Sequence, residues 1–323
     1  TGVNLTQARI DSFTTVLQSY TGLNSVGSFG LVNNLNPLAN IFARIDINLP
    51  FNSQLVMRHN YGHAENDVFS RSNASFKLSD NSYFFNSTKQ APAMQLRTLF
   101  GNGAFNEVMV GYTQIRDRRT PRVKSPQLTV LANAAVTVNL VAGSERFSHG
   151  NELDQDIFEV TENFTMPMGS HRVTVGTQNQ FQKFRNLFAQ STLGVWEFQS
   201  LDSLRNGLAR QYIVGVPLAG GVPGGDGAVR FKSAIYSAYA QDEWTFSQRL
   251  NLTAGLRVDV PVFNDKPPEN TAFATAYGGR KTSETPLEQL SQREMQVMMM
   301  VTQGQTIQAI SERLHLSPKT VST

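Results

Sequence analysis

Two histidines and two acidic residues stand close together in the first quarter of the chain. His59 and His63 are four residues apart, and Glu65 and Asp67 follow them. In a strand, alternate residues share a face, so both imidazoles would point to the same side. Imidazole and carboxylate groups together bind ions such as Zn²⁺. A metal site is one interpretation of this segment, and the polar end of a strand is the interpretation that we prefer.

A second cluster consists of carboxylates, at Glu152, Asp154, Asp156 and Glu159. Carboxylate oxygens are good ligands for Ca²⁺, but we interpret these residues as solvated side chains of a loop. No Gly-x-Ser-x-Gly sequence marks a serine nucleophile. The chain has no Cys, which rules out disulfides and thiolate metal ligands. We therefore expect no catalytic residue, no metal and no cofactor.

The elements that position these residues follow a period of two as far as about Gly279. This period places apolar side chains on one face of a strand and polar side chains on the other. In the clearest case, polar residues separate six apolar ones: Leu250, Leu252, Ala254, Leu256, Val258 and Val260. A strand of this kind lies between an apolar and an aqueous environment.

Short polar segments join such strands into hairpins. We predict three hairpins and one further strand, over residues 41–49 with 55–61, 157–166 with 172–184, 233–245 with 250–260, and 105–115. Other connections are long, as in 117–126 and 185–231. A short amphipathic helix is predicted over residues 3–20 from the helical spacing of its apolar residues.

Composition restricts the class of protein further. Only 16% of the 323 residues are charged, against about 25% in ordinary soluble domains. Phe is common, at 21 residues. No run of about 18 apolar residues exists, so a transmembrane helix is not expected. Low charge with many aromatics is typical of a sheet that has one face in lipid.

The hairpin at 233–260 contains two recognisable sequence motifs. Tyr239 to Trp244 reads YAQDEW, and Leu252 to Asp259 reads LTAGLRVD. Both resemble the barrel of TonB-dependent outer-membrane receptors, most closely the Oar-like group. The segment from Asn40 to Tyr61, which contains FARIDINLPFNSQLVMRHNY, is similar to another hairpin of that group.

This resemblance covers about residues 1–279. It implies ligand uptake across the outer membrane without catalysis, with outer-membrane lipid and the TonB system as partners. The chain shows no plug domain, TonB-contacting segment or closing strand of that family, so the resemblance implies an interior part of a barrel that does not function alone. The ligand is not indicated. Arg116, Arg118, Arg119, Arg122 and Lys124 could attract nucleic acid, and a strand-to-loop position at the level of lipopolysaccharide explains this basic run equally well.

From Leu290 onward the period becomes helical. Ser291 and Glu294 form a capping box, Gly304 ends a first helix, and Ser317 with Pro318 begins another after an intervening helix. Helix, short turn and helix in this order predict a helix-turn-helix.

The wording of this segment, LSQREMQVMMMVTQGQTIQAISERLHLSPKTVST, is very similar to the DNA-binding domain of LuxR-type response regulators of the GacA/UvrY kind. The resemblance covers about residues 284–323 and implies DNA as a partner. It places Ser317, Lys319, Thr320 and Thr323 at the start of the recognition helix and Gln305 and Thr306 near the DNA backbone. The segment stops before the basic part of that helix and before the family's dimer-forming helix.

We therefore predict a mainly β fold, a partial antiparallel transmembrane β-barrel followed by a small helix-turn-helix. The predicted domains are residues 1–279 and 290–323, with a junction at 280–289 that we interpret as joining pieces of two proteins. The main functional hypothesis is a fragment of an outer-membrane receptor. The alternative is a cytoplasmic, DNA-binding transcriptional regulator.

A soluble β-sandwich or solenoid is a weaker alternative for the first part. It predicts that apolar strand residues such as Leu252, Leu256 and Val258 point into an enclosed core, whereas a barrel predicts that they point outward.

Overall fold

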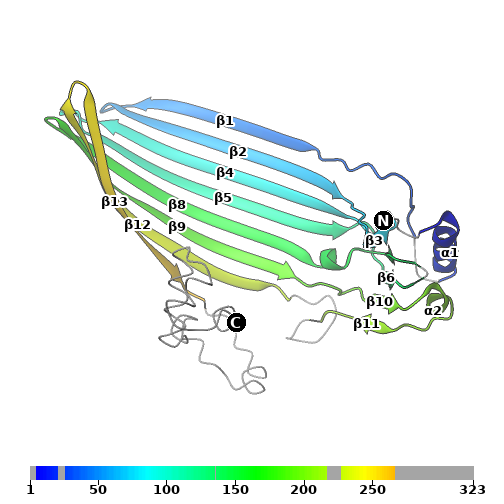
Figure 1. Ribbon diagram of the computed structural model, residues 1–323. Coiled ribbons are helices and arrows are strands. Elements are labelled where there is room, and N and C mark those ends of the chain that lie inside the picture. Colours follow the sequence, from blue (N-terminus) through cyan, green and yellow to red (C-terminus); the bar gives the residue numbers. More distant parts are fainter. Residues whose placement is uncertain (1–4, 21–25, 135, 217–226, 266–323) are drawn as a thin grey trace, which may run out of the picture. The chain divides into compact units, whose positions relative to one another are not determined.

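The computed structural model describes residues 5–20, 26–134, 136–216 and 227–265, which belong to one compact unit that ends at Asp265 (Figure 1). The elements in these residues are α1 (Gln7–Gln18), β1 (Leu38–Leu49), β2 (Ser53–Val68), β3 (Ser75–Lys77), β4 (Tyr83–Leu99), β5 (Phe105–Pro121), β6 (Gln127–Val130), β7 (Asn139–Ala142), η1 (Arg146–Ser148), β8 (Asn151–Met168), β9 (His171–Phe188), β10 (Val195–Phe198), α2 (Leu201–Arg205), β11 (Gln211–Ile213), β12 (Val229–Ser247) and β13 (Leu250–Phe263).

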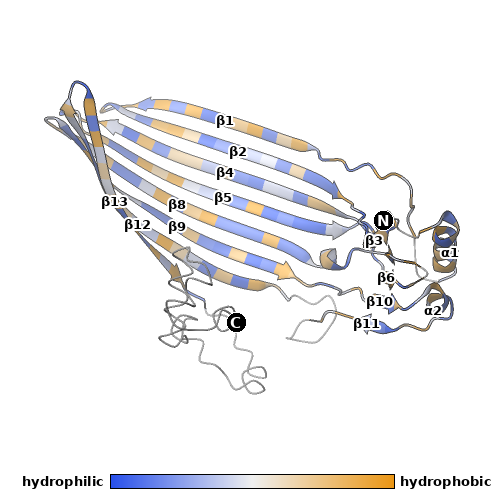
Figure 2. Ribbon diagram, viewed as in Figure 1, coloured by the Kyte–Doolittle hydropathy of each residue, from blue (hydrophilic) through white to orange (hydrophobic). Residues whose placement is uncertain are grey.

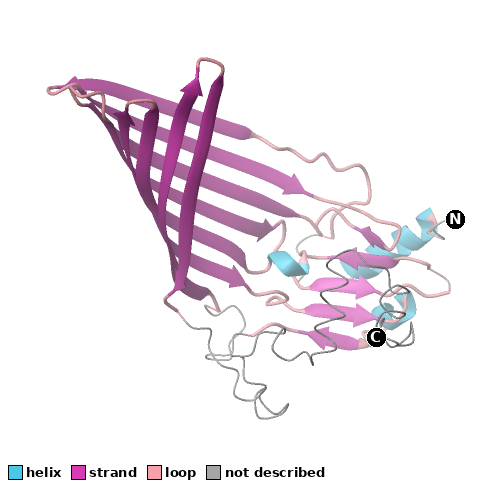
Figure 3. Cartoon of the chain, turned by 60° about the vertical axis from the view of Figure 1, so that its left-hand side comes forward, coloured by secondary structure: helices cyan, strands magenta, loops and turns pink. Residues whose placement is uncertain are grey.

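Eight of the strands in the described residues form one antiparallel sheet, which we call the long sheet. Its order is β1-β2-β4-β5-β8-β9-β12-β13, and Figure 3 shows that it is strongly curved. The strands have 12 to 19 residues, more than the roughly 9 to 11 that a tilted strand needs to cross a bilayer. Tight turns join the strands at one end, and long connections join them at the other (Figure 1).

The two faces of the long sheet differ in polarity, as the alternating colours of Figure 2 show. Directly opposed residues of antiparallel strands share a face, so the registers trace each face across the sheet. One row of what we call the apolar face comprises Ile45, Met57, Met94, Val110, Val160, Asn179, Tyr236 and Val260. One row of what we call the polar face comprises Asp46, Val56, Gln95, Met109, Thr161, Gln178, Ser237 and Asp259.

Among the described residues, no protein layer covers the apolar face of β13, the strand with the clearest alternation. Leu252, Leu256 and Val258 are 45%, 73% and 55% exposed. This result contradicts the enclosed core that a soluble sandwich requires at these positions and is consistent with a partial barrel. The hydrophobic side chains of this face would therefore be buried by lipid and not by protein.

Aromatic residues lie near both ends of the apolar face. Toward the long connections, the ring of Phe181 lies 6.2 Å from that of Phe158 and 5.8 Å from that of Tyr236. Toward the turns, Trp244 lies 5.0 Å from Phe246 and 5.3 Å from His171. From Tyr236 to Phe246 the strand rises about 33 Å, or about 25 Å along the normal at a tilt of about 40°. That span matches the apolar band of outer-membrane barrels, which aromatic girdles border.

The long connections fold into what we call the loop subdomain. A five-stranded sheet in the described residues has the order β11-β10-β6-β7-β3, with α1 and α2 packed against it. Its core contains Phe13 and Leu17 of α1, Leu78, Leu140 and Leu204, all 0% exposed. The largest hydrophobic core of the described residues is therefore here and not under the long sheet.

Several predictions of the fold are confirmed. The chain is mainly β, the three predicted hairpins are β1/β2, β8/β9 and β12/β13, and a helix occupies Gln7–Gln18 within the predicted 3–20. The long connection predicted over 185–231 is present between the end of β9 at Phe188 and the start of β12 at Val229, and it contains β10, α2 and β11. No helix in the described ranges is long and apolar enough to cross a membrane. The predicted junction at 280–289 and helix-turn-helix at 290–323 lie outside the described residues.

Candidate functional site on the polar face of the long sheet

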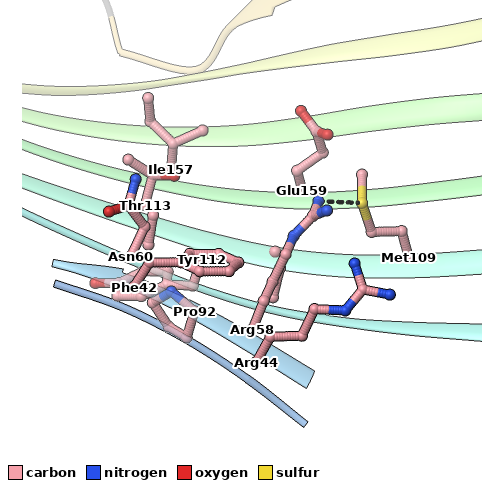
Figure 4. Close-up of a pocket in the computed structure, with 13 residues that line it drawn as sticks. Phe42, Arg44, Arg58, Asn60, Pro92, Met109, Tyr112, Thr113, Ile157 and Glu159 are labelled. Atoms are coloured by element: carbon pink, nitrogen blue, oxygen red, sulfur yellow. Dashed lines mark hydrogen bonds between the residues drawn. The ribbon is translucent and has the colours of Figure 1, made fainter. Parts of the chain in front are cut away.

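A shallow depression of about 430 Å³ lies on the polar face where β1, β2, β4, β5 and β8 run side by side. Side chains alternate between the two faces of a strand, so each strand contributes every second residue to the lining of the depression. The charged groups are Arg44 of β1, Arg58 of β2 and Glu159 of β8. Figure 4 shows both guanidinium groups and the Glu159 carboxylate on the same side of the strands, near Met109.

The two arginines of this depression differ in their partners. Arg44 makes a bidentate ion pair with Asp46, with both N–O distances at 2.7 Å. Arg58 donates to the Sδ atom of Met109 at 3.2 Å and, within the described part of the chain, has no carboxylate partner. Arg44 and Arg58 are directly opposed in the register, and like charges so placed repel. The Arg58 guanidinium is thus available to an anionic group.

A second polar network spans β8, β9, β12 and β13. Arg257 pairs with Asp259 at 2.8 Å and donates to Ser237 Oγ at 3.0 Å and Gln178 Oε1 at 3.1 Å. The Tyr239 hydroxyl donates to Asn163. Amide, hydroxyl and charged groups therefore cover the polar face, which suits hydrogen bonding to water or to a polar ligand.

A serine and a histidine lie within hydrogen-bond distance of each other in the loop subdomain. Ser144 Oγ is 2.6 Å from His149 Nε2, but Ser144 is fully buried and its hydroxyl donates to the carbonyl of Ser125. His149 Nδ1 accepts from the backbone N–H of Leu193 at 3.1 Å. Burial lowers the pKa of His149, and the nearby Glu145 carboxylate opposes this effect. The pair is structural, because Ser144 has no access to a substrate.

The histidine segment has no metal-binding geometry. His63 bonds to Thr88 at 3.0 Å and to Glu65 at 3.2 Å, and Asp67 forms an ion pair with Arg122 at 2.6 Å. Among the residues that the structure describes, no group of three or more His, Cys, Asp or Glu side chains could hold a metal ion. The segment lies in β2, where Glu65 and Asp67 are close to the end of the strand and His59 is near its middle.

The acidic and basic clusters neutralise each other. Glu152, Asp154 and Asp156 lie in β8, so the prediction that they belong to a loop is wrong. They form ion pairs with basic residues of the flanking strands β5 and β9: Arg116 with Asp156 at 2.7 Å, Arg118 with Asp154 at 2.6 Å, and Arg185 with Glu152 at 2.6 Å. Much of the basic charge from Arg116 to Arg122 is therefore engaged within the protein.

The residues predicted to contact DNA, Gln305, Thr306, Ser317, Lys319, Thr320 and Thr323, all lie outside the described residues. Sequence reasoning did not single out Arg44 or Arg58, and it placed Glu159 in the acidic cluster and not beside these arginines. The alternation assigns each to the polar side of its strand, but long connections separate their hairpins, so their registers are not readable from the sequence.

A sheet with one apolar and one polar face, tight turns at one end and folded connections at the other is the architecture of an outer-membrane β-barrel wall. Comparison with known families agrees, because the outer membrane beta barrel domain family matches residues 2–307. The chain belongs to this family, and its location is the outer membrane. The match runs past the junction predicted at 280–289.

Individual relatives match smaller parts. The outer membrane transporter YddB from Escherichia coli is a structural neighbour with a TM-score of 0.48 and 13% identity, covering 72% of this chain and 28% of that one. The response regulator UvrY from Escherichia coli is 54% identical over 41 residues, which are 13% of this chain and 19% of UvrY. The response regulator GacA from Pseudomonas protegens is 48% identical over 42 residues, or 13% and 20% of the two chains. The chain thus spans about a fifth of the curated relatives that it matches.

Proposed function

We propose that this chain forms part of the wall of a TonB-dependent receptor that takes up a ligand across the outer membrane without catalysis. The observation that carries the proposal is the separation of faces. One face of the long sheet is apolar between two sets of aromatic residues, and the other presents charged and amide groups. In a closed barrel the polar face lines the interior, where a polar ligand passes.

Two further features support uptake. The hairpin wording at Tyr239 to Asp259 resembles that of TonB-dependent receptors. Arg58 presents a guanidinium without a carboxylate partner among the described residues, which favours a ligand with a carboxylate or phosphate group. TonB dependence and the ligand class rest on these features together with family membership.

An uptake assay in cells that make the complete receptor tests the proposal. We would measure uptake of labelled peptides, oligosaccharides and metal chelates with and without the receptor, and with and without TonB. We expect uptake of one class to require both proteins, and Arg58→Gln to slow it. Arg249→Gln, in the turn before β13, is the matched control and should have no effect. Uptake that continues without TonB contradicts the proposal.

A second candidate function is DNA binding by the C-terminal segment, since the 41-residue match to UvrY is 54% identical. A peptide of residues 284–323 tests it by thermal unfolding and by DNA binding at several salt concentrations. If the segment acts as the DNA-binding domain of a regulator, we expect the peptide to unfold cooperatively and to bind DNA with an affinity that falls as the salt concentration rises. Absence of both results would contradict this candidate function.

A further inference from the structure

Four basic residues form a compact block on the apolar face, close to the loop subdomain. Lys232 of β12 is directly opposite Lys183 of β9, and Arg230 is directly opposite Arg185. We call these four residues the cation block. Like charges that face each other across two strands destabilise a sheet. Two consecutive pairs of this kind therefore call for an anionic partner.

The two arginines of the block have partners within the protein. Arg230 donates to the carbonyl oxygen of Ala228 at 3.3 Å. Arg185 is paired with Glu152 at 2.6 Å and Asp154 at 3.4 Å. Asp156, which faces Lys183 from β8, is already held by Arg116 at 2.7 Å and by the Tyr112 hydroxyl at 2.9 Å.

Among the described residues, neither lysine of the block has a carboxylate partner for its ammonium group. Asp265 accepts from the backbone N–H of Lys232 at 2.6 Å. Lys183 and Lys232 are exposed, and their ammonium groups have no ion pair with any residue that the structure describes. Each ammonium group therefore has donors free for an external anion.

The block lies where the apolar band ends. Phe181 precedes Lys183 by two residues on the same face of β9, and its ring contacts Phe158 and Tyr236. A molecule bound at this position would contact the ammonium groups at its end nearer the loop subdomain. At its end nearer the turns it would contact the aromatic rings. The chemistry that fits both is an amphiphile with an anionic headgroup and fatty chains.

We propose that the cation block is a binding site for a phosphate-bearing lipid of the outer leaflet. Its phosphate groups would lie between Lys183 and Lys232, and its acyl chains over Phe181 and Tyr236. The site is on the opposite face from the depression at Arg58, so it serves the attachment of lipid to the wall and is independent of the proposed uptake.

Binding of defined probes to the chain in detergent micelles tests this site. The probes are bisphosphorylated lipid A, the same lipid without phosphate, and inorganic phosphate. The double variant Lys183→Gln with Lys232→Gln should bind lipid A at least about tenfold more weakly, because two charge-assisted contacts are lost. Lys89→Gln is the matched control. It removes a lysine at a similar height on the polar face, because Lys89 shares a row with Ile115, Gln155 and Phe184.

A further variant separates binding from folding. Lys232→Glu places a carboxylate opposite Lys183, so we expect its melting temperature in detergent to equal or exceed that of the wild type, while lipid A binding is lost. Equal binding by wild type and double variant overturns the proposal, as does an equal loss in Lys89→Gln. Inorganic phosphate binding as tightly as lipid A also overturns it, because the ligand would then be a soluble anion. Tight binding of the lipid without phosphate has the same consequence.

Discussion

At the scale of single residues, His149 shows how a buried polar group joins the loop subdomain to the long sheet. Its Nδ1 accepts from the Leu193 N–H, so the neutral ring carries its proton on Nε2, which faces Ser144 Oγ. His149 follows η1 and precedes β8. A second proton on Nδ1 would remove the acceptor for Leu193. The neutral imidazole is therefore the form that fits this position.

This arrangement predicts a pH dependence. Burial sets the pKa of His149 below its ordinary value of 6.5, so the unfolded chain binds the proton first as the pH falls. The contribution of neutral His149 to the free energy of unfolding is therefore full above about pH 6.5, and it is lost as the pH falls below that value. Denaturant unfolding measures the stability of the loop subdomain at pH 7.5 and at pH 5. Between these two pH values, His149→Gln should lose less unfolding free energy than the wild type. Equal losses would show that His149 is not responsible.

Gly176 of β9 gives a steric prediction. Tyr239 lies directly opposite it, and a Cβ at Gly176 would come within 2.5 Å of the Tyr239 ring and 2.7 Å of the Glu162 carbonyl oxygen. Because the second contact is with backbone, Gly176→Ala should destabilise the sheet by about 1–3 kcal/mol. Thermal unfolding measures the effect. Gly111→Ala is the control, since its Cβ would meet nothing within 4 Å.

At the scale of elements, the edge strand β13 separates the two faces most clearly. Leu256→Arg would place a charge on the apolar face, opposite Ala240, and should cost about 2–4 kcal/mol in a bilayer. Thr253→Arg lies on the polar face opposite Glu243 and should be nearly neutral. Unfolding of both variants from lipid vesicles checks the difference. Equal costs would contradict the assignment of the faces.

Helix α1 stabilises the loop subdomain rather than the wall. Phe13 is fully buried among Leu17, Leu78 and Leu140. Phe13→Ala should destabilise this subdomain by about 3–5 kcal/mol. Limited proteolysis should then cut the connections between β5 and β8 and between β9 and β12 sooner, while the strands of the long sheet stay protected. Protection of the connections at the wild-type level would contradict the role of α1.

These elements also show what the sequence can predict. The hairpins β1/β2 and β12/β13 were predictable, because strict alternation and a short polar turn define them locally. Strand β4 was not predicted, since Lys89 to Ala93 has little contrast between its two faces and includes Pro92. The strands of the loop subdomain have three or four residues, too few for a period to emerge. The cation block depends on the pairing of β9 with β12, which a long connection separates.

At the scale of the whole molecule, the described residues form a wall with two edges. β1 pairs with β2 and β13 pairs with β12, and neither has a second neighbour in the described part of the chain. In lipid, each unpaired backbone group costs several kcal/mol. The physical expectation is that further strands close the wall into a barrel, with the polar face inside.

The most direct test determines whether each face of the long sheet contacts lipid or water. Because the chain has no Cys, single introduced cysteines can be labelled for this purpose. Ala240→Cys and Gln241→Cys place single thiols at consecutive positions of β12, on the apolar and polar faces respectively. In lipid vesicles we predict that the thiol at 240 reacts with a lipid-soluble maleimide and resists a charged, impermeant reagent, while the thiol at 241 reacts with the charged reagent. Equal reaction of both thiols with the charged reagent would contradict a membrane-facing sheet.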